Sequence, residues 1–161
     1  VVGHPPAFGR MPQALTIRSR WEADDAAIRQ IYAACHPGWP TRAPRWFEAH
    51  PTLVAEVGRE IVGYTSYSVV MQPEVSRTGE IMVGYGIDIK PGHHGQKYGR
   101  ALCDARLAIA RAVGAKVFVG HAAPDNHAMI HLFLQDGFRE FGRAPGAYPD
   151  GSAMLIYMGK V

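Results

Sequence analysis

The order of hydrophobic and polar positions near the start of the chain indicates a strand followed by a helix. Residues 15–18 alternate apolar and polar side chains, which is typical of a half-buried strand. Asp24 and Asp25 are both plausible N-caps for a helical pattern that continues to about Cys35, and Pro37 is expected to end that helix. We therefore predict a β–α pair at this end of the chain.

The next segment changes from a helical to a β pattern. A short helix is predicted around residues 45–50, where Pro51 closes it. Two runs rich in β-branched and aromatic residues, 53–57 and 61–70, then flank the turn-like sequence 58–60. This arrangement is typical of a β-hairpin.

Residues 80–89 predict a further strand, which has two glycines in its interior. Glycine weakens a strand because it has no side chain to pack. Gly84 and Gly86 therefore indicate a β-bulge, or a place where a ligand approaches the backbone closely.

The second half of the chain contains the clearest helical pattern. Apolar positions recur at helical spacing through residues 97–113, and Gly114 is expected to stop the helix. A short buried strand is predicted over 116–120. A second helix follows it, capped by Asp125 or Asn126.

Two strands, 138–141 and 154–158, complete the pattern and are joined by a loop that contains residues 146–151. The order is strand, helices, three strands, helix, strand, helix and strands, with no internal repeat and no linker that divides it. We therefore predict one domain over residues 14–161, preceded by a flexible N-terminal extension over residues 1–13.

Composition and charge narrow the class of protein. Of the 161 residues, 47% are hydrophobic and 19% are charged, which is globular composition. No stretch approaches the ~18 unbroken apolar residues of a membrane-spanning helix. The net charge of +3 is spread along the chain, so it favours an anionic ligand but lacks the basic face of a nucleic-acid binder. Cys35 and Cys103 suggest no disulfide framework, so we expect a cytoplasmic protein.

The most informative segment is 87–102, in which a strand runs through a glycine-containing turn directly into the best helix. Unpaired backbone N–H groups converge at the positive end of the helix dipole in such a turn, and this favours a phosphate. Gly95 and Gly99 would let the backbone approach an anion. Three side chains could add donors or positive charge: His94, Lys97 and Arg100.

A plain strand-to-helix turn is the alternative to a phosphate site, because short glycine motifs often match by chance. Two other phosphate-binding motifs are excluded. A Walker loop requires Gly-Lys followed by Ser or Thr, and this triplet does not occur. Gly84 and Gly86 could begin a dinucleotide fingerprint, but Ile89 stands where its third glycine is required and no helix begins there.

The same segment resembles the signature of the GNAT acetyltransferases. That signature is Arg or Gln, two residues, Gly, one residue, then Gly or Ala, after a strand that ends in an apolar-x-Pro step. Residues 89–91 supply the step and 94–102 the signature, with His94 at the Arg or Gln position and Lys97 at the first glycine. A second match lies at 126–138, where the family has Asn, a helix that carries Tyr, and Gly-Phe. The two motifs follow the family's order of elements.

This resemblance implies an α+β fold with a mixed, mostly antiparallel central sheet flanked by helices, and acetyl-CoA in a cleft where two strands splay apart. The backbone of residues 87–89 would pair with the pantetheine arm, and Asn126 would line the same cleft while capping its helix. The residues expected to bind acetyl-CoA are Ile87, Asp88, Ile89, His94, Gly95, Gln96, Lys97, Tyr98, Gly99, Arg100, Asn126 and Phe133.

The resemblance also leads us to look for a group that protonates the departing thiolate. The family's tyrosine corresponds to Phe133, which has no proton to give. Tyr148 and Tyr98 could replace it, or the thiolate could leave without a dedicated acid. Ordinary packing of a half-buried tyrosine is the alternative interpretation of both. We take Tyr148 as the catalytic acid.

The base that removes a proton from the incoming ammonium is expected among Glu80, Asp88 and His121, and we take Glu80. A solvated or hydrogen-bonded side chain is the alternative for each. His127 and His131 lie four residues apart on one helix face, but no third ligand is evident, so we expect no metal.

We therefore expect an N-acetyltransferase in which an amine attacks acetyl-CoA directly in a ternary complex. The acceptor, a small-molecule or protein amine, would enter near residues 36–45, a loop region with Trp39 and the neighbouring Trp46. Aminoacyl-tRNA is the only nucleic acid that we consider as a partner. We expect no membrane association, and formation of a homodimer is possible from the sequence. Two alternatives remain: a non-catalytic CoA-binding or protein-interaction module with the same fold, and a toxin that acetylates aminoacyl-tRNA.

Overall fold

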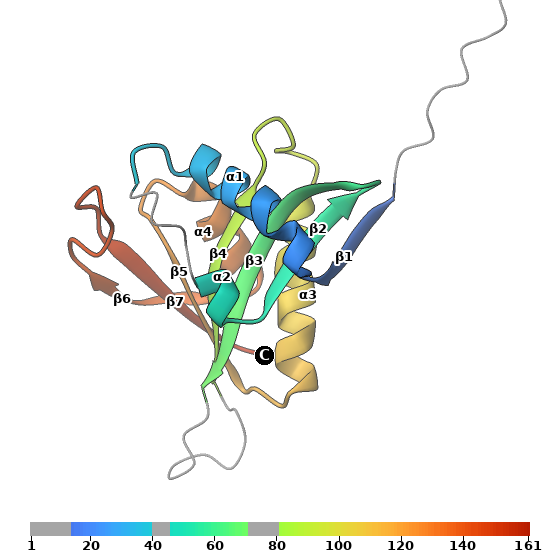
Figure 1. Ribbon diagram of the computed structural model, residues 1–161. Coiled ribbons are helices and arrows are strands. Elements are labelled where there is room, and N and C mark those ends of the chain that lie inside the picture. The colour runs from blue at the N-terminus through green and yellow to red at the C-terminus, as the bar shows by residue number, and fades with distance from the viewer. Residues whose placement is uncertain (1–13, 40–45, 71–80) are drawn as a thin grey trace, which may run out of the picture.

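The computed structural model describes residues 14–39, 46–70 and 81–161 (Figure 1). The strands are Leu15–Ser19 (β1), Thr52–Val57 (β2), Glu60–Val70 (β3), Ile81–Ile89 (β4), Val117–Ala122 (β5), Arg139–Ala144 (β6) and Met154–Lys160 (β7). The helices are Asp25–Cys35 (α1), Trp46–Ala49 (α2), Tyr98–Ala112 (α3) and His127–Gln135 (α4), and a 3-10 helix spans Glu22–Asp24.

All seven strands form one sheet in the order β1-β2-β3-β4-β5-β7-β6. β4 and β5 run parallel, and every other neighbouring pair is antiparallel. This mixed, mostly antiparallel sheet flanked by helices confirms the predicted α+β fold. The predicted extension over residues 1–13 lies outside the described residues.

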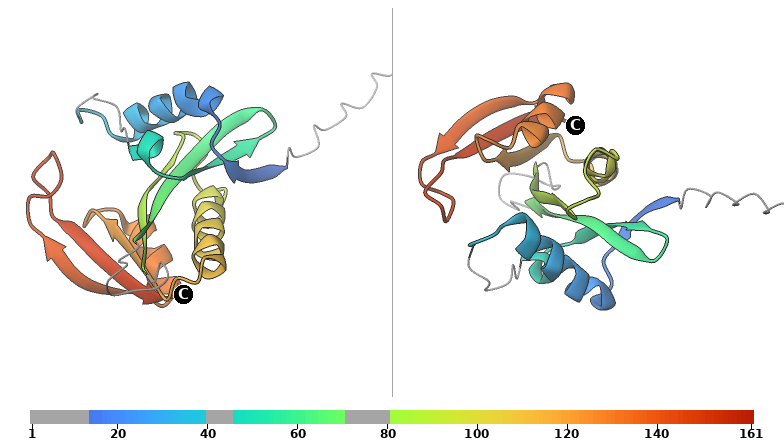
Figure 2. Two further views of the ribbon diagram at one scale, coloured as in Figure 1. Left: turned by 60° about the horizontal axis from the view of Figure 1, so that its bottom comes forward. Right: turned by 90° about the horizontal axis from the view of Figure 1, so that it is seen from above.

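The helices cover the two faces of the sheet in separate groups (Figure 2). On one face α1 packs with Phe47, Val54 and Tyr64. On the other face α3 and α4 enclose the larger part of the core, in which Leu107 and Phe118 are almost fully buried. Because strand side chains alternate between faces, β3 can contribute Tyr64 to the α1 side and Thr65 to the α3 side.

β4 and β5 pair only at one end, and this opens the sheet at its centre. The parallel pairing covers residues 81–83 of β4 and 117–119 of β5. Beyond that point β4 continues along β3, whereas β5 continues along β7. The two strands therefore diverge, as Figure 1 shows, and leave part of each edge without a neighbouring strand.

The predicted irregularity in the glycine-bearing strand is present as a β-bulge in β4. Its partner register shifts between Thr65 opposite Ile87 and Tyr67 opposite Gly84, so β4 carries one extra residue there. Gly84 is required at this place because a Cβ on it would lie 2.7 Å from the guanidinium of Arg106.

The helix ends follow from local residue chemistry. Asn126 is the N-cap of α4, and its side chain accepts a hydrogen bond from the Met129 N–H. Asp24 is the N-cap residue of α1 but makes no capping bond there. Its carboxylate instead accepts bonds from the Arg18 guanidinium and the Trp21 N–H.

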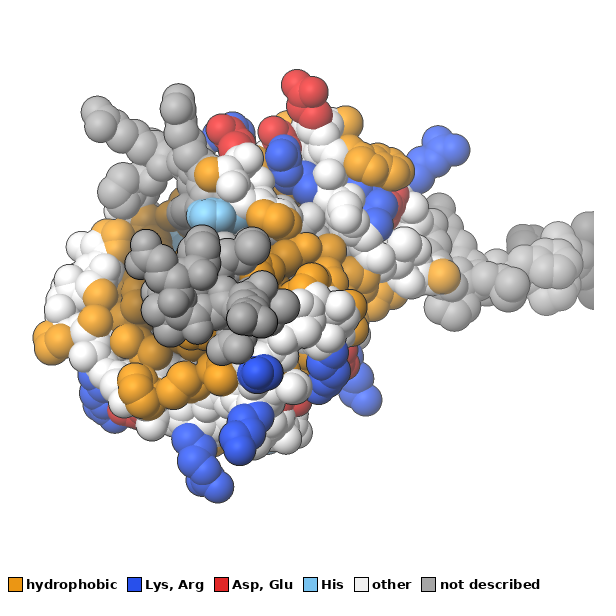
Figure 3. Space-filling view, turned by 90° about the horizontal axis from the view of Figure 1, so that it is seen from below, with side chains coloured by type: hydrophobic (Ala, Val, Ile, Leu, Met, Phe, Trp, Pro, Cys, Tyr) orange, Lys and Arg blue, Asp and Glu red, His pale blue; other side chains and the backbone are white. Residues whose placement is uncertain are grey.

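The end of the molecule seen from below carries hydrophobic side chains bordered by lysines and arginines (Figure 3). Ile81, at the described start of β4, is 39% exposed.

Within the described ranges, no helix is long and apolar enough to cross a membrane.

Candidate active site

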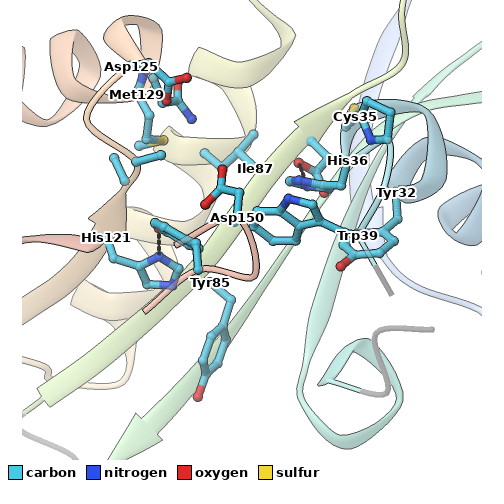
Figure 4. A pocket seen from close by; sticks show the side chains of 17 residues that line it. Tyr32, Cys35, His36, Trp39, Tyr85, Ile87, His121, Asp125, Met129 and Asp150 are labelled. Carbon is cyan, nitrogen blue, oxygen red and sulfur yellow. Dashed lines mark hydrogen bonds and ion pairs between the residues drawn. The ribbon is translucent and has the colours of Figure 1, made fainter. Parts of the chain in front are cut away.

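A cavity of about 570 Å³ lies where β4 and β5 diverge (Figure 4). Its walls come from the end of α1 and the loop after it, from β4, from β5 with the start of α4, and from the loop between β6 and β7. Figure 4 shows His36 and Trp39 on one side of the cavity and His121 and Met129 on the other. Segments far apart in sequence therefore line one cavity, which is open to solvent on part of its surface.

The backbone of β4 forms the floor of this cavity. Ile87 and Asp88, two of the residues expected to bind acetyl-CoA, line it together with Gly86. The Lys90 N–H bonds to the Val62 carbonyl of β3, so with alternating strand geometry the peptide groups of Ile87 point away from β3 towards the open side. This part of β4 is thus an accessible strand edge.

Ile89, the third β4 residue predicted to bind acetyl-CoA, already has hydrogen-bond partners for its carbonyl. Its carbonyl accepts a hydrogen bond from the Cys35 thiol and lies 3.1 Å from His94 Nε2. His94 therefore ties the end of β4 to the turn that leads into α3. It is itself exposed, so its ring borders the turn rather than filling it.

The turn before α3 has the backbone conformation that a glycine would favour. Lys97, at the N-cap of α3, has φ +63° and is the only described non-glycine residue with positive φ. Gly95, with φ +77°, adopts the same region. Lys97 makes no side-chain cap, so the first N–H groups of the helix stay available to an anion.

Four more residues that were predicted to bind acetyl-CoA lie in this turn or in the first turn of α3: Gln96, Tyr98, Gly99 and Arg100. The Tyr98 hydroxyl donates to the Gln96 side-chain oxygen at 2.7 Å, and both residues border the turn. A Cβ on Gly99 would make ordinary van der Waals contacts, 3.9 Å from Ile89 and 4.0 Å from Ile87, so a small side chain could be accommodated there. Arg100 forms ion pairs with Asp104 on the same helix and with Asp136 at the end of α4, so its charge is already paired rather than free for a ligand.

A buried carboxylate, Asp88, lies between β4 and α1. It accepts a hydrogen bond from the Tyr64 hydroxyl at 2.7 Å, and its second oxygen lies 3.0 Å from His36 Nε2. Burial and the nearby Asp88 charge raise the pKa of Tyr64 far above its usual value, so this phenol stays protonated. Sequence reasoning missed the His36–Asp88 contact, because its partners are 52 positions apart and no local motif joins them.

Tyr148 reaches the opposite wall of the cavity. Its hydroxyl lies 3.1 Å from His121 Nδ1, and its ring lies 5.6 Å from the Trp39 ring. Burial raises the pKa of Tyr148, with a smaller contribution from Asp150. Burial lowers the pKa of His121, and the Arg106 charge adds to this effect, so a neutral imidazole faces a protonated phenol.

Asn126 also lines the cavity, so its capping role and its predicted place in the cleft coexist. Phe133 lies elsewhere: its ring is 1% exposed and stacks on Tyr157 and Phe138 in the core. Glu80, the predicted base, lies outside the described residues. In the described part of the chain, no group of three His, Cys, Asp or Glu residues could hold a metal ion.

Arg106 is a further polar residue beside the site that sequence reasoning did not identify. It is 1% exposed, and its Nη1 donates to the Tyr85 carbonyl at 2.6 Å and to the Thr65 hydroxyl at 2.8 Å. The available signal was its position in α3, one turn after Leu102 on the buried face, where an arginine is unusual.

Comparison with known proteins agrees with this geometry. The model of the acetyltransferase (GNAT) family matches residues 22–138. The mycothiol acetyltransferase of Sanguibacter keddieii is 34% identical over 98 residues, which are 60% of this chain and 30% of that protein. The mycothiol acetyltransferase of Frankia alni is 28% identical over 131 residues, which are 79% of this chain and 34% of that protein. The chain thus spans about a third of the length of these curated relatives.

A solved structure matches over nearly the whole length of both chains. It is yncA, a putative acetyltransferase from Salmonella typhimurium solved with its cofactor acetyl-CoA. The two proteins are 27% identical and have a TM-score of 0.73, with 91% of this chain and 94% of that chain covered. Because the family model also covers more than half of the sequence, this chain belongs to the GNAT acetyltransferase family.

Proposed function

We propose that this protein transfers the acetyl group of acetyl-CoA to an amine by direct attack in a ternary complex. The observation that carries the proposal is the cavity at the diverging strands, because it combines an open β4 edge with half-buried proton-transfer groups. The nearby N-terminus of α3 adds free N–H donors for the phosphates.

The residues present suit the two ends of acetyl-CoA. The open edge of β4 at Ile87 can pair with the amide groups of a pantetheine arm as an added strand would. Gly95 and Gly99 leave the backbone of the turn uncovered, and the side chains of His94 and Lys97 are exposed beside it. We assign ten of the twelve residues predicted from the sequence to this site. The other two, Arg100 and Phe133, would act only indirectly, through the ion pairs and packing that hold α3 and α4.

A covalent acetyl-enzyme is disfavoured by the state of the cavity's thiol. Cys35 lines the cavity, but burial and the Asp88 charge raise its pKa to about 11. A thiol with that pKa is almost entirely protonated at neutral pH, and the thiolate is the nucleophile. Acetyl-CoA supplies an activated acyl group, so an amine held beside it can react without an intermediate on the protein.

Two groups of the cavity can manage the protons. Tyr148, protonated at neutral pH, can donate to the departing thiolate, and His121 holds its hydroxyl. On the opposite wall, His36 is oriented by Asp88 and can accept the proton of the incoming ammonium. Glu80 stays a prediction for the same role.

The acceptor side of the cavity favours a cationic amine. Trp39 and Tyr148 present aromatic surfaces, which attract ammonium groups, and the carboxylates of Asp88, Asp125 and Asp150 line the same cavity. Small-molecule amines and protein amines both satisfy this chemistry. Aminoacyl-tRNA also carries an amine, so the experiment below includes it and tests the alternative that the protein is a toxin that acetylates aminoacyl-tRNA.

The test is turnover with a panel of amines, with released CoA followed by a thiol reagent. We expect CoA release that depends on both acetyl-CoA and one class of amine. The panel includes polyamines, amino acids, peptides with free N-termini and aminoacyl-tRNA, and translation inhibition by the protein with acetyl-CoA identifies the last of these. Binding of acetyl-CoA without turnover on any amine would contradict the proposal and favour a non-catalytic CoA-binding module.

A further inference from the structure

Arg106 is a buried cation without a carboxylate partner among the described residues. Removing a guanidinium from water is costly unless its donors are used, so an unpaired arginine in a core requires an explanation. Among the described residues, its Nε has no hydrogen-bond partner, and its oxygen acceptors are the Tyr85 carbonyl and the Thr65 hydroxyl. Burial lowers its pKa to about 10, so it remains charged at neutral pH.

The surroundings of Arg106 leave room for the guanidinium at the β4 bulge. Its Cζ lies 4.9 Å above the centre of the Phe118 ring, which is a cation–π contact. The missing side chain of Gly84 opens the space beside it, since a Cβ there would lie 2.7 Å from Nη1. The Thr65 hydroxyl also donates to the Tyr85 carbonyl at 3.3 Å. One backbone carbonyl thus receives two donors from the α3 side.

The orientation of that carbonyl fixes the next N–H group. Peptide bonds are planar, and all described ones are trans, so the Tyr85 carbonyl and the Gly86 N–H point in opposite directions. With the carbonyl turned towards α3, the Gly86 N–H points to the other face of β4. That face carries α1 and the cavity, which Gly86 lines.

We propose that Arg106 is a positioning residue for acetyl transfer: by holding the Tyr85 carbonyl, it aims the Gly86 N–H into the cavity as a donor to the thioester oxygen. This inference rests on the proposed function. The charge of Arg106 also polarises the peptide group between the two residues, because a charge-assisted bond to the carbonyl strengthens the N–H as a donor. An N–H held in this way stabilises the negative charge that develops on the thioester oxygen.

The experiment compares Arg106→Met with Arg111→Met, a control at an exposed arginine on the same helix. Two quantities are measured: kcat at saturating acetyl-CoA, and the infrared carbonyl band of bound acetyl-CoA labelled with ¹³C at the acetyl carbonyl. In the unmodified protein, we expect the band to move to lower frequency on binding. In Arg106→Met it should return towards its position in solution, and kcat should fall by up to about 10²–10³-fold, the effect of losing one oxyanion donor entirely, because the Gly86 N–H remains but is no longer held by the guanidinium.

The affinity for CoA, which has no acetyl carbonyl, should be unchanged in Arg106→Met, because the residue acts on the acetyl group alone. Arg111→Met should keep the band, kcat and affinity. A purely structural role would lower the melting temperature without moving the band. Therefore the inference is overturned if acetyl-CoA bound to folded Arg106→Met keeps the same lowered carbonyl frequency as in the unmodified protein, whatever the melting temperature or kcat.

Arg106→Lys serves if the methionine variant does not fold. It keeps a charge but has a single ammonium in place of the planar fork, so we expect an intermediate band position and an intermediate kcat. If Arg106→Lys has the same carbonyl band position and the same kcat as the unmodified protein, the proposed role of Arg106 is also overturned. Failure of the unmodified protein to bind acetyl-CoA would instead overturn the proposed function.

Discussion

Tyr148 is the residue on which the proposed proton transfer depends most. It contacts His121, lies beside Trp39, and stays protonated at neutral pH because burial raises its pKa. By the resemblance of residues 126–138 to the family's second motif, Phe133 is expected at the usual donor position, and its buried ring has no hydroxyl. We therefore propose Tyr148 as the proton source, and solvent or Tyr98 as the alternatives.

Tyr148→Phe separates these cases. If Tyr148 is the donor, the rate of acetyl transfer should fall by about 10²–10⁴, the usual contribution of a positioned general acid, and we expect this outcome. The measurement is single-turnover kinetics with saturating acetyl-CoA. Tyr157→Phe, which removes a phenol from the core, is the control for the loss of a hydroxyl. Full turnover by a folded Tyr148→Phe that binds acetyl-CoA normally would leave solvent or Tyr98 as the source.

Lys97 stores backbone strain at the start of α3. A side chain with a Cβ is disfavoured at φ +63°, and the family has glycine at this position of its signature. We expect Lys97→Gly to be more stable than Lys97→Ala by about 1 kcal/mol, because both remove the charge and only glycine relieves the strain. Urea unfolding of the two variants measures the difference. Equal stability, or a more stable alanine variant, would mean that the turn relaxes around a Cβ.

At the scale of the elements, the sequence predicted the order of strands and helices because periodicity and caps are local signals. The helix predicted over 97–113 is observed as α3, and the strand predicted over 116–120 extends to Ala122. The short 3-10 helix was not predicted, because its stabilising contacts come from Arg18 and Asp24, which pair only in the folded chain. The periodicity of apolar residues cannot predict helix and strand ends that depend on such contacts.

Close packing of β5 against α4 is an element-scale feature that the sequence did not indicate. A Cβ at Gly120 would lie 2.4 Å from the Phe133 ring, so the strand can pass the helix only with glycine there. We expect Gly120→Ala to destabilise the protein by about 1–3 kcal/mol, as overpacking does. Gly142→Ala in β6 is the matched control, since its Cβ would meet nothing within 4 Å. Thermal unfolding compares the two, and equal melting temperatures would show that Phe133 moves aside freely.

At the scale of the molecule, the site divides into a part that local sequence predicts and a part that only the fold assembles. The turn from β4 into α3 is contiguous, so its glycines, helix start and anion preference could be predicted together. The pairs His36–Asp88 and His121–Tyr148 join segments 52 and 27 positions apart. No pattern along the chain indicates which distant side chains the diverging strands bring together.

We propose that acetyl-CoA binds along the open edge of β4 with its phosphates at the turn before α3. Gly99→Val places a branched side chain where the backbone must approach the pyrophosphate. The first carbon of that side chain has ordinary contacts, 3.9 Å from Ile89 and 4.0 Å from Ile87, so the variant is expected to fold.

Calorimetric titration of acetyl-CoA into the unmodified protein and into Gly99→Val is the most direct test. We expect saturable binding to the unmodified protein at one ligand per chain, with a higher melting temperature, since ligand at a hundredfold excess over Kd adds about 2.7 kcal/mol of stability. Gly99→Val should bind at least about tenfold more weakly, a loss of about 1.4 kcal/mol. Absence of binding to the unmodified protein at millimolar acetyl-CoA, or unchanged affinity in a folded Gly99→Val, would contradict the account.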